Sequence, residues 1–322
     1  MKLSVLTNLY GGLSLDETLA KLASLGVEAA EIGCGGYPGK AHCDPKVLLN
    51  DDAKRKEFLD TFDKYNIKLA AFACHGNPIH PDKARAKAYD DDLRDAILLA
   101  EKVGVDTIVV FSGCPAGAPG DKMPNWATCA WPDEFSRVLE YQWNEVLIPY
   151  WKEMAKFAEA HNVPRLAFEM HPGFCVYNPE TLMRLREACG PVIGANLDPS
   201  HLIWQGCEPA AVVRYLGDAI YHVHAKDTKI DPINSPAFGN LDTKHYSKEK
   251  ERAWVFRTVG YGHGADWWKE FVSQLRLVGY DRVLSIEHED SLMSVDEGLK
   301  KACDFLLDVM IKEPKPGTMS WA

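Results

Sequence analysis

Residues 193–201 read Ile-Gly-Ala-Asn-Leu-Asp-Pro-Ser-His, and this stretch has the pattern of a strand that ends at a proline. Its apolar residues alternate with small or polar ones, a period of two that is typical of a strand. Pro199 ends the strand because proline has no N–H for the ladder, so the carboxylate of Asp198 lies at the carboxyl edge, with His201 three residues beyond. Such an ending indicates either a metal or catalytic edge or a cap on the following helix. The other strand ends decide between the two.

Composition limits the class of protein. A length of 322 residues fits either two domains or one α/β barrel. The formal net charge of −10, without a block of Lys or Arg, gives no footprint for a phosphate backbone, so we expect no nucleic acid partner. The N-terminus has no signal-peptide pattern and no apolar run approaches ~18 residues, so we expect a cytoplasmic protein with no membrane partner. The nine cysteines include no Cys-x-x-Cys pair, which favours reduced thiols over disulfides.

Taken in order, the chain repeats one unit, a short apolar run followed by apolar residues at helical spacing. The expected strands are 3–6, 27–32, 67–74, 105–111, 165–170, 192–198, 219–226 and 282–287. The expected helices are 14–25, 51–65, 81–103, 134–161 with a break at Pro149, 179–189, 209–216, 266–278 and 295–311. Ser14 and Glu17 have the spacing of a capping box at the first helix.

Eight strand-and-helix units predict an α/β fold, a single (β/α)8 TIM barrel over residues 1–312, followed by a C-terminal tail at 313–322. Long loops are expected after strand 4, at 112–132, and after strand 7, at 228–260, where the sequence shows no strong period. A doubly wound open sheet is the alternative fold. It usually carries a Gly-rich phosphate turn after its first strand, and residues 7–14 contain no G-x-G-x-x-G pattern.

Four successive strands end in side chains of the types that serve as metal ligands in proteins. Alternation places Glu169, Asp198, His224 and Glu287 toward the barrel axis at the carboxyl ends, where the active sites of such barrels form. Three carboxylates in one pocket raise one another's pKa unless a cation lies among them. Oxygen ligands with one imidazole suit Mn²⁺, Mg²⁺, Co²⁺ or Zn²⁺, so we expect one divalent metal ion. Each residue taken alone is explained by capping or salt bridging, and Lys226 offers charge neutralisation without a metal.

Other polar side chains near these strand ends are less specific. His222 lies deeper in the barrel and is expected to be a hydrogen-bonded core histidine. His171 follows Glu169 closely enough to face a substrate, or belongs only to a turn. Glu31, near the end of the second strand, is a further candidate for substrate contact, whereas Glu289 is interpreted as solvated loop charge.

At these residues the chain resembles the xylose-isomerase-like TIM barrels, the sugar phosphate isomerase/epimerase group that includes ketose 3-epimerases, inosose dehydratase and apurinic endonucleases. The motifs that carry the resemblance are Glu169, Asp198-Pro-Ser-His201, His222-Val-His224-Ala-Lys-Asp227 and Glu287. The resemblance implies one divalent ion, commonly Mn²⁺, bound by Glu169, Asp198, His224 and Glu287. It also implies that the two glutamates act as acid and base, that His201 touches substrate, and that His75 contacts substrate or a further metal.

Two branches of this family fit less well. The endonuclease branch needs a His at the fourth strand end and an Asp-x-His after the seventh strand, whereas this chain has Phe111-Ser112-Gly113 at the first place and no such motif after His224. The ketose-epimerase branch usually offers an Arg shortly after the seventh-strand His. Ile230 lies in that region here, so Lys226, Asp227 or the insertion would have to substitute.

The expected function is a divalent-metal-dependent isomerase or epimerase that transfers a proton next to a carbonyl through a metal-stabilised enediolate, with Glu169 and Glu287 as acid and base. Loss of a leaving group from the same enediolate would make the protein a lyase, either a dehydratase or a keto-glycoside eliminase. A non-catalytic metal- or sugar-binding barrel is a third reading. No basic cluster accompanies the site, so the expected substrate is an unphosphorylated keto-sugar or cyclitol.

Both long loops leave carboxyl ends of strands and are expected to stand over the pocket. Trp126 and Trp131 in the first loop are candidates to stack on a sugar face, and Lys226 and His171 are further candidates for substrate contact. The alternative for the two tryptophans is packing onto the barrel or onto a neighbouring subunit, which leaves a homo-oligomer open.

Overall fold

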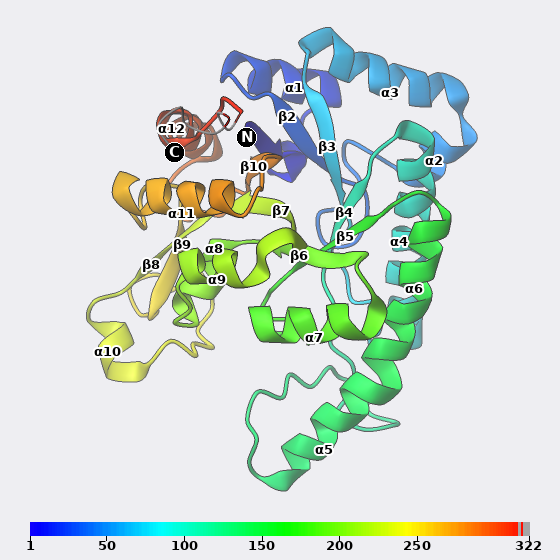
Figure 1. Ribbon diagram of the computed structural model, residues 1–322, viewed down its shortest axis with the longest axis vertical. Helices are drawn as coiled ribbons and strands as arrows, with labels where there is room; N and C mark the ends of the chain where they lie inside the picture. Colours follow the sequence, from blue (N-terminus) through cyan, green and yellow to red (C-terminus); the bar gives the residue numbers. More distant parts are fainter. Residues whose placement is uncertain (315–316, 318–322) are drawn as a thin grey trace.

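The computed structural model describes residues 1–314 and 317, and its strands form one closed barrel (Figure 1). The barrel strands are β1 (Lys2–Leu6), β2 (Ala29–Gly33), β3 (Lys68–Ala73), β4 (Thr107–Val110), β5 (Arg165–Glu169), β6 (Ile193–Leu197), β7 (Ile220–Ala225) and β10 (Val283–Ile286). Every strand is parallel to its neighbours, and β1 closes the barrel by pairing with both β2 and β10. The predicted TIM barrel is therefore confirmed. The expected tail at 313–322 lies mostly outside the described residues.

Helices surround the strands because each carries one apolar face toward the barrel. They are α1 (Leu15–Ser24), α3 (Asp52–Tyr65), α4 (Lys83–Val103), α6 (Ile148–Ala160), α7 (Pro179–Cys189), α9 (Pro209–Leu216), α11 (Ala265–Leu277) and α12 (Val295–Val309). The predicted capping box is present at α1, where Ser14 Oγ accepts from the Glu17 N–H and the Glu17 carboxylate accepts from the Ser14 N–H. Among the described residues, no helix has both the length and the apolarity to cross a membrane.

The alternation expected in β5 is also observed. Trp151 of α6 is fully buried and its ring lies 4.5 Å from that of Phe168, in an edge-to-face arrangement. Phe168 therefore faces the helices, which leaves its neighbours Ala167 and Glu169 to face the barrel axis.

The helical stretch before β5 is not broken at Pro149. Helix α5 (Asp133–Tyr141) runs into a π-helical segment (Gln142–Leu147), and α6 follows directly with Pro149 in its first turn. The π-helical turn just before Pro149 shifts the hydrogen-bond pattern, as in the bond from the Ile148 N–H to the Trp143 carbonyl, and so accommodates a residue that has no N–H. The wider turn before it replaces the break that the sequence suggested.

The segment 228–260 is the predicted insertion after β7, but it is not loop throughout. It contains most of an antiparallel pair, β8 (Asp227–Ile230) and β9 (Trp254–Arg257), and a short helix, α10 (Asn234–Phe238). One short helix was missed, α2 (Pro45–Asn50), and the helix considered after Asp198 is present as α8 (Pro199–Trp204). The pair β8 and β9 is separated by a long connection, so no short turn signal marks it as a hairpin.

Asp227 anchors this insertion to the barrel. It is fully buried at the first position of β8, directly after β7, and its two oxygens accept six hydrogen bonds of 2.8–3.2 Å. The donors are the backbone N–H groups of Thr228, Gly260, Gly262 and His263, the His263 ring and the Trp268 indole. A Cβ at Gly262 would lie 2.3 Å from Asp227 Oδ1, so only glycine leaves room for this arrangement.

Replacing Asp227 with Ala should lower the free energy of unfolding by about 3 kcal/mol or more, because several buried N–H groups lose their acceptor and each costs roughly 1–3 kcal/mol. Urea unfolding followed by circular dichroism measures the change. Asp266→Asn, at an exposed position of α11, is the control and should change the stability by less than about 0.5 kcal/mol. Equal stability of both variants and the parent chain would contradict the anchoring role.

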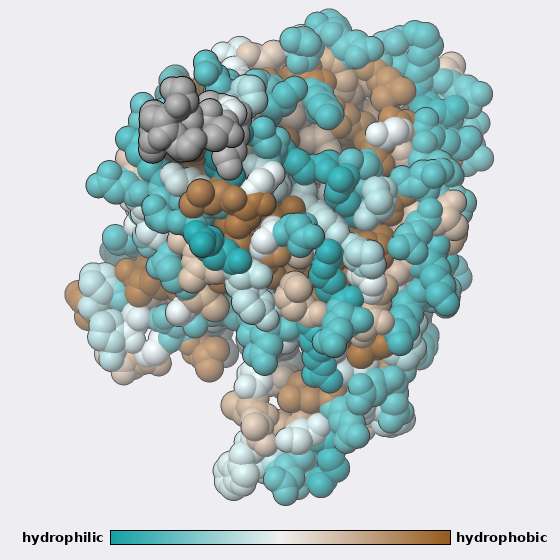
Figure 2. Space-filling model, in the orientation of Figure 1, coloured by the Kyte–Doolittle hydropathy of each residue, from teal (hydrophilic) through white to brown (hydrophobic). Residues whose placement is uncertain are grey.

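Two segments project from the barrel. Helix α5 with the loop 112–132 extends from one side, and α10 with its flanking loops extends from another (Figure 1). Figure 2 shows a hollow between these two projections. Both segments follow carboxyl ends of strands, as expected from the order of the chain.

Candidate metal centre

Four side chains from neighbouring strand ends converge at the carboxyl end of the barrel. Glu169 ends β5, Asp198 follows β6, His224 lies in β7 and Glu287 follows β10, and these strands are adjacent in that order. Each side chain offers one ligand atom, and the four atoms lie within 4.8 Å of one another. The structure therefore brings together the four residues that the strand ends singled out.

Asp198 serves both purposes that its sequence context suggested. It is the N-cap of α8, with Oδ1 accepting a hydrogen bond of 2.8 Å from the Ser200 N–H. Its other oxygen, Oδ2, is buried without a hydrogen-bond partner and belongs to the cluster. Burial raises the pKa of Asp198 to about 7, against the opposing effect of Lys226. Such a raised pKa marks a carboxylate whose charge is not fully compensated.

His224 is held from below by Glu31. Its Nε2 lies 3.1 Å from Glu31 Oε2, and Glu31 also contacts His222 Nε2 at 2.8 Å and the Ser285 hydroxyl at 2.8 Å. This leaves His224 Nδ1 facing the cluster, 3.2 Å from Glu169 and 3.4 Å from Glu287 but without hydrogen-bond geometry to either. A carboxylate behind a metal-binding histidine fixes the ring orientation and raises its basicity.

Glu31 was expected to contact substrate, and the structure places it one layer below the cluster. It is fully buried, and its carboxylate is surrounded by the three donors just described. Burial raises the pKa of Glu31, but His224 and His222 lower it further, so the carboxylate stays ionised. His222, as expected, is a hydrogen-bonded histidine of the barrel interior.

Glu169 lies among several donors. Its Oε2 is 3.0 Å from His75 Nε2 and accepts a hydrogen bond of 3.1 Å from Asn196 Nδ2, and its Oε1 lies 3.1 Å from His201 Nε2 without hydrogen-bond geometry. Burial raises the pKa of Glu169, but His201, His224 and His75 together lower it well below its usual range. His75 and His201, the two histidines expected near substrate, therefore both lie against this carboxylate.

Lys226 brings a buried ammonium group to the cluster. Its Nζ lies 2.5 Å from Glu287 Oε2, 3.2 Å from Asp198 Oδ2 and 3.0 Å from Glu289 Oε2. Burial raises the pKa of Glu287, but Lys226 and His224 outweigh burial and lower it to about 2. The interpretation of Glu289 as solvated loop charge is only half right, because its side chain is 51% exposed yet contacts Lys226.

The cluster fits a divalent cation. In the protonation state that binds a metal, with the three carboxylates ionised and His224 neutral, the cluster sets three negative charges against the one positive charge of Lys226. Two of its buried ligand atoms, Asp198 Oδ2 and His224 Nδ1, have no hydrogen-bond partner. Unpaired buried groups of this kind are costly, and a metal ion would satisfy both. Three oxygens and one imidazole nitrogen suit Mn²⁺, Mg²⁺, Co²⁺ or Zn²⁺.

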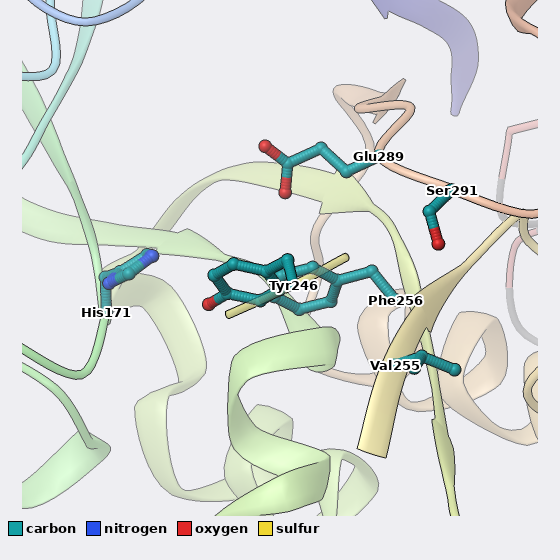
Figure 3. Close-up of a pocket in the computed structure, with 6 residues that line it drawn as sticks. All are labelled: His171, Tyr246, Val255, Phe256, Glu289 and Ser291. Atoms are coloured by element: carbon teal, nitrogen blue, oxygen red, sulfur yellow. The ribbon is translucent and has the colours of Figure 1, made fainter. Parts of the chain in front are cut away.

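A pocket of about 450 Å³ opens beside the cluster (Figure 3). It is lined by His171, Tyr246, Val255, Phe256, Glu289 and Ser291. The Phe256 ring centroid lies 4.7 Å from Lys226 Nζ and 5.3 Å from the ring of His201. The His171 and His201 rings lie 4.1 Å apart. The pocket therefore adjoins the side chains that surround the candidate metal ligands.

The two tryptophans of the loop 112–132 lie elsewhere. Trp126 packs edge-to-face on Tyr177 at 5.6 Å and lines a separate hollow between that loop, α5 and α7. Trp131 is 79% exposed. Neither residue lines the pocket beside the cluster.

Sequence reasoning missed four residues that surround the site. The strand alternation could have indicated Asn196, because it shares the inward face of its strand with Gly194 and Asp198. Glu289 carried a weaker signal, because it follows Glu287 at a spacing of two. Tyr246 and Phe256 carried none, since their positions depend on a strand pair that the sequence did not predict.

Comparison with known proteins places the chain in a family. A family model described as xylose isomerase-like TIM barrel matches residues 19–309. The chain belongs to the xylose isomerase-like TIM barrel family. The resemblance seen in the strand-end motifs is thereby confirmed.

Two relatives align with most of the chain. The uncharacterized protein YfiH of Bacillus subtilis is 42% identical over 308 residues, which cover 95% of this chain and 98% of YfiH. An inosose dehydratase of Mesomycoplasma hyopneumoniae is 23% identical, with 92% of this chain and 89% of the relative covered.

Solved structures of similar shape support the fold. The probable 3-DHS dehydratase AsbF of Bacillus anthracis has a TM-score of 0.65 at 16% identity, with 95% of this chain and 99% of that chain covered. IOLI protein with a binding zinc atom has a TM-score of 0.63 at 18% identity, covering 96% and 98%. D-psicose 3-epimerase of Clostridium cellulolyticum H10 has a TM-score of 0.59 at 16% identity, covering 96% and 99%.

Proposed function

We propose that the chain is a divalent-metal-dependent isomerase or epimerase that moves a proton next to the carbonyl of an unphosphorylated keto-sugar or cyclitol. The observation that carries the proposal is the convergence of Glu169, Asp198, His224 and Glu287, with two buried ligand atoms that make no hydrogen bond. The family and the named epimerase among the similar structures support this reaction class. A divalent ion bound there, Mn²⁺ by preference, supplies a Lewis acid for the carbonyl and its neighbouring hydroxyl.

The placement of the two glutamates suits transfer of a proton between two faces. Glu169 and Glu287 come from the outer two of four adjacent strands, with Asp198 and His224 between them. One carboxylate removes the proton on the carbon next to the carbonyl, and the other returns a proton from the opposite side. Such a transfer inverts the carbon and gives epimerisation.

Each glutamate has partners that hold it in place. His75, Asn196 and His201 surround Glu169, so its carboxylate is oriented before substrate arrives. Lys226 holds Glu287 in the same way. Groups fixed in advance lower the barrier because they need no reorganisation during the reaction.

A phosphate group has no obvious place at this site. The ammonium of Lys226 is already shared among Asp198, Glu287 and Glu289, and Glu289 adds a carboxylate to the pocket wall. An anionic substituent would meet this carboxylate rather than an unpaired cation. The geometry therefore favours a neutral substrate.

A lyase is the second candidate, and Lys226 is the observation that favours it. Removal of the same proton followed by cleavage of the neighbouring C–O bond forms a double bond and releases water or an alcohol. A buried ammonium beside the acid and base can stabilise negative charge that develops on the departing oxygen. Two of the similar proteins are named as dehydratases.

One experiment separates these reactions. The protein with Mn²⁺ is incubated in D₂O with a panel of keto-sugars, cyclitols, keto-glycosides and sugar phosphates, and NMR follows deuterium uptake and products. Uptake with the carbon skeleton retained supports the isomerase or epimerase, and loss of water or aglycone supports the lyase. Uptake confined to sugar phosphates would refute the argument from charge. No uptake in any compound would leave a non-catalytic sugar- or metal-binding barrel.

A further inference from the structure

We propose that the pocket beside the cluster is a second subsite, which binds a neutral ring joined to the reacting keto ring through a glycosidic oxygen. This inference rests on the proposed function, since it narrows the substrate to a keto-glycoside rather than a free keto-sugar or cyclitol. It is carried by the residues of the insertion and not by the metal-binding residues.

The pocket adjoins the place where the chemistry is proposed. Its inner wall is Phe256, which lies against both Lys226 and His201. Its outer wall includes Glu289, whose carboxylate contacts the same Lys226. A molecule with one ring at the cluster therefore has a continuous path for a second ring into the pocket.

An aromatic platform forms one side of the pocket. The Tyr246 and Phe256 rings lie 5.9 Å apart and are inclined by only 16° (Figure 3). Phe256 is nearly buried, whereas Tyr246 is 53% exposed and offers ring surface to solvent. Aromatic faces of this kind pack against the apolar faces of sugar rings and against other rings.

The platform is braced from behind rather than left loose. The buried guanidinium of Arg252 lies 4.3 Å from the Tyr246 ring centroid and 4.5 Å from that of Trp254. Trp254 in turn stacks on Trp204 of α8 at 4.8 Å. Because these contacts fix Tyr246 in advance, binding costs little conformational entropy.

The rest of the wall matches a neutral polar ring. Ser291, His171 and the Glu289 carboxylate offer donors and acceptors to hydroxyl groups, and Val255 adds apolar surface. A volume of about 450 Å³ falls within the range of small-molecule sites, and the candidate metal ligands are not among its lining residues. The pocket therefore has room for a group in addition to the ring that reacts.

Binding of unreactive probes tests the subsite without relying on turnover. Isothermal titration calorimetry compares phenyl β-D-glucopyranoside with methyl β-D-glucopyranoside, which share the sugar ring and differ in the ring attached to it. We expect the phenyl compound to bind at least about tenfold more tightly, and Tyr246→Ala to remove that difference. Tyr215→Ala changes a similarly exposed tyrosine on α9 and should preserve the difference. Equal affinities for the two probes, no binding of the phenyl probe, or an unchanged ratio in Tyr246→Ala would overturn the subsite.

Turnover then separates this inference from the function on which it rests. In the D₂O assay, kcat/KM for a keto-glycoside should exceed that for the free keto-sugar of the same reacting ring about tenfold or more, and Tyr246→Ala should reduce the ratio. Deuterium uptake without a preference for the keto-glycoside would support the proposed function and contradict the subsite. Tight phenyl binding without uptake in any compound would support the subsite and contradict the proposed chemistry.

Discussion

Replacing Glu169 or Glu287 with glutamine should lower kcat about 100- to 10,000-fold, the range that general acid–base catalysis contributes. Glutamine keeps the shape of each side chain but cannot accept the proton. For Glu169 the new amide also lies against the His75 and His201 rings, so part of the loss will come from altered positioning. The measurement is the rate of deuterium uptake at saturating substrate.

The control for this experiment is Glu208→Gln, at an exposed carboxylate in the N-cap position of α9 that makes no capping hydrogen bond. It should leave kcat within about twofold of the parent chain. Thermal unfolding of all three variants checks that each is folded. Site variants that retain kcat within tenfold of the parent would exclude the two glutamates as acid and base.

The fold could be predicted because its signal is local and repeated. Apolar runs followed by helical spacing recur eight times, and the strand of 193–198 already showed the alternation and the proline stop that place Asp198 at an edge. Barrel topology then determines which ends meet. From these two facts the convergence of Glu169 and Asp198 with the later His224 and Glu287 followed without any contact information.

What the sequence did not predict depends on pairing between distant residues. Glu31 contacts His222 and Ser285, which lie 191 and 254 residues away in the sequence, and no local pattern predicts such contacts. The pairing of β8 with β9 is of the same kind, and the positions of Tyr246 and Phe256 follow from it. The pocket wall was therefore beyond prediction, although the loop that forms it was correctly placed over the site.

Exhaustive chelation should abolish turnover and lower the melting temperature, because an ion that binds only the folded state stabilises it by mass action. At a free metal concentration of 100 times Kd this contribution is about 2.7 kcal/mol, which corresponds to roughly 4 °C for a domain of 322 residues. Differential scanning calorimetry with and without Mn²⁺ measures the shift, and elemental analysis counts the bound ions.

A pair of aspartate variants shows where that ion binds. Asp198→Asn removes the charge of a buried oxygen that accepts no hydrogen bond, yet leaves Oδ1 able to cap α8, so it should fold while losing most of the stabilisation by Mn²⁺. Asp266→Asn changes an exposed carboxylate and should keep the full shift. Because Asp198 is also crowded by neighbouring carboxylates, its neutral variant should be no less stable than the parent chain when both lack metal. The same Mn²⁺ shift in both variants would place the ion elsewhere, and a fully active chelated protein would remove the metal from the mechanism.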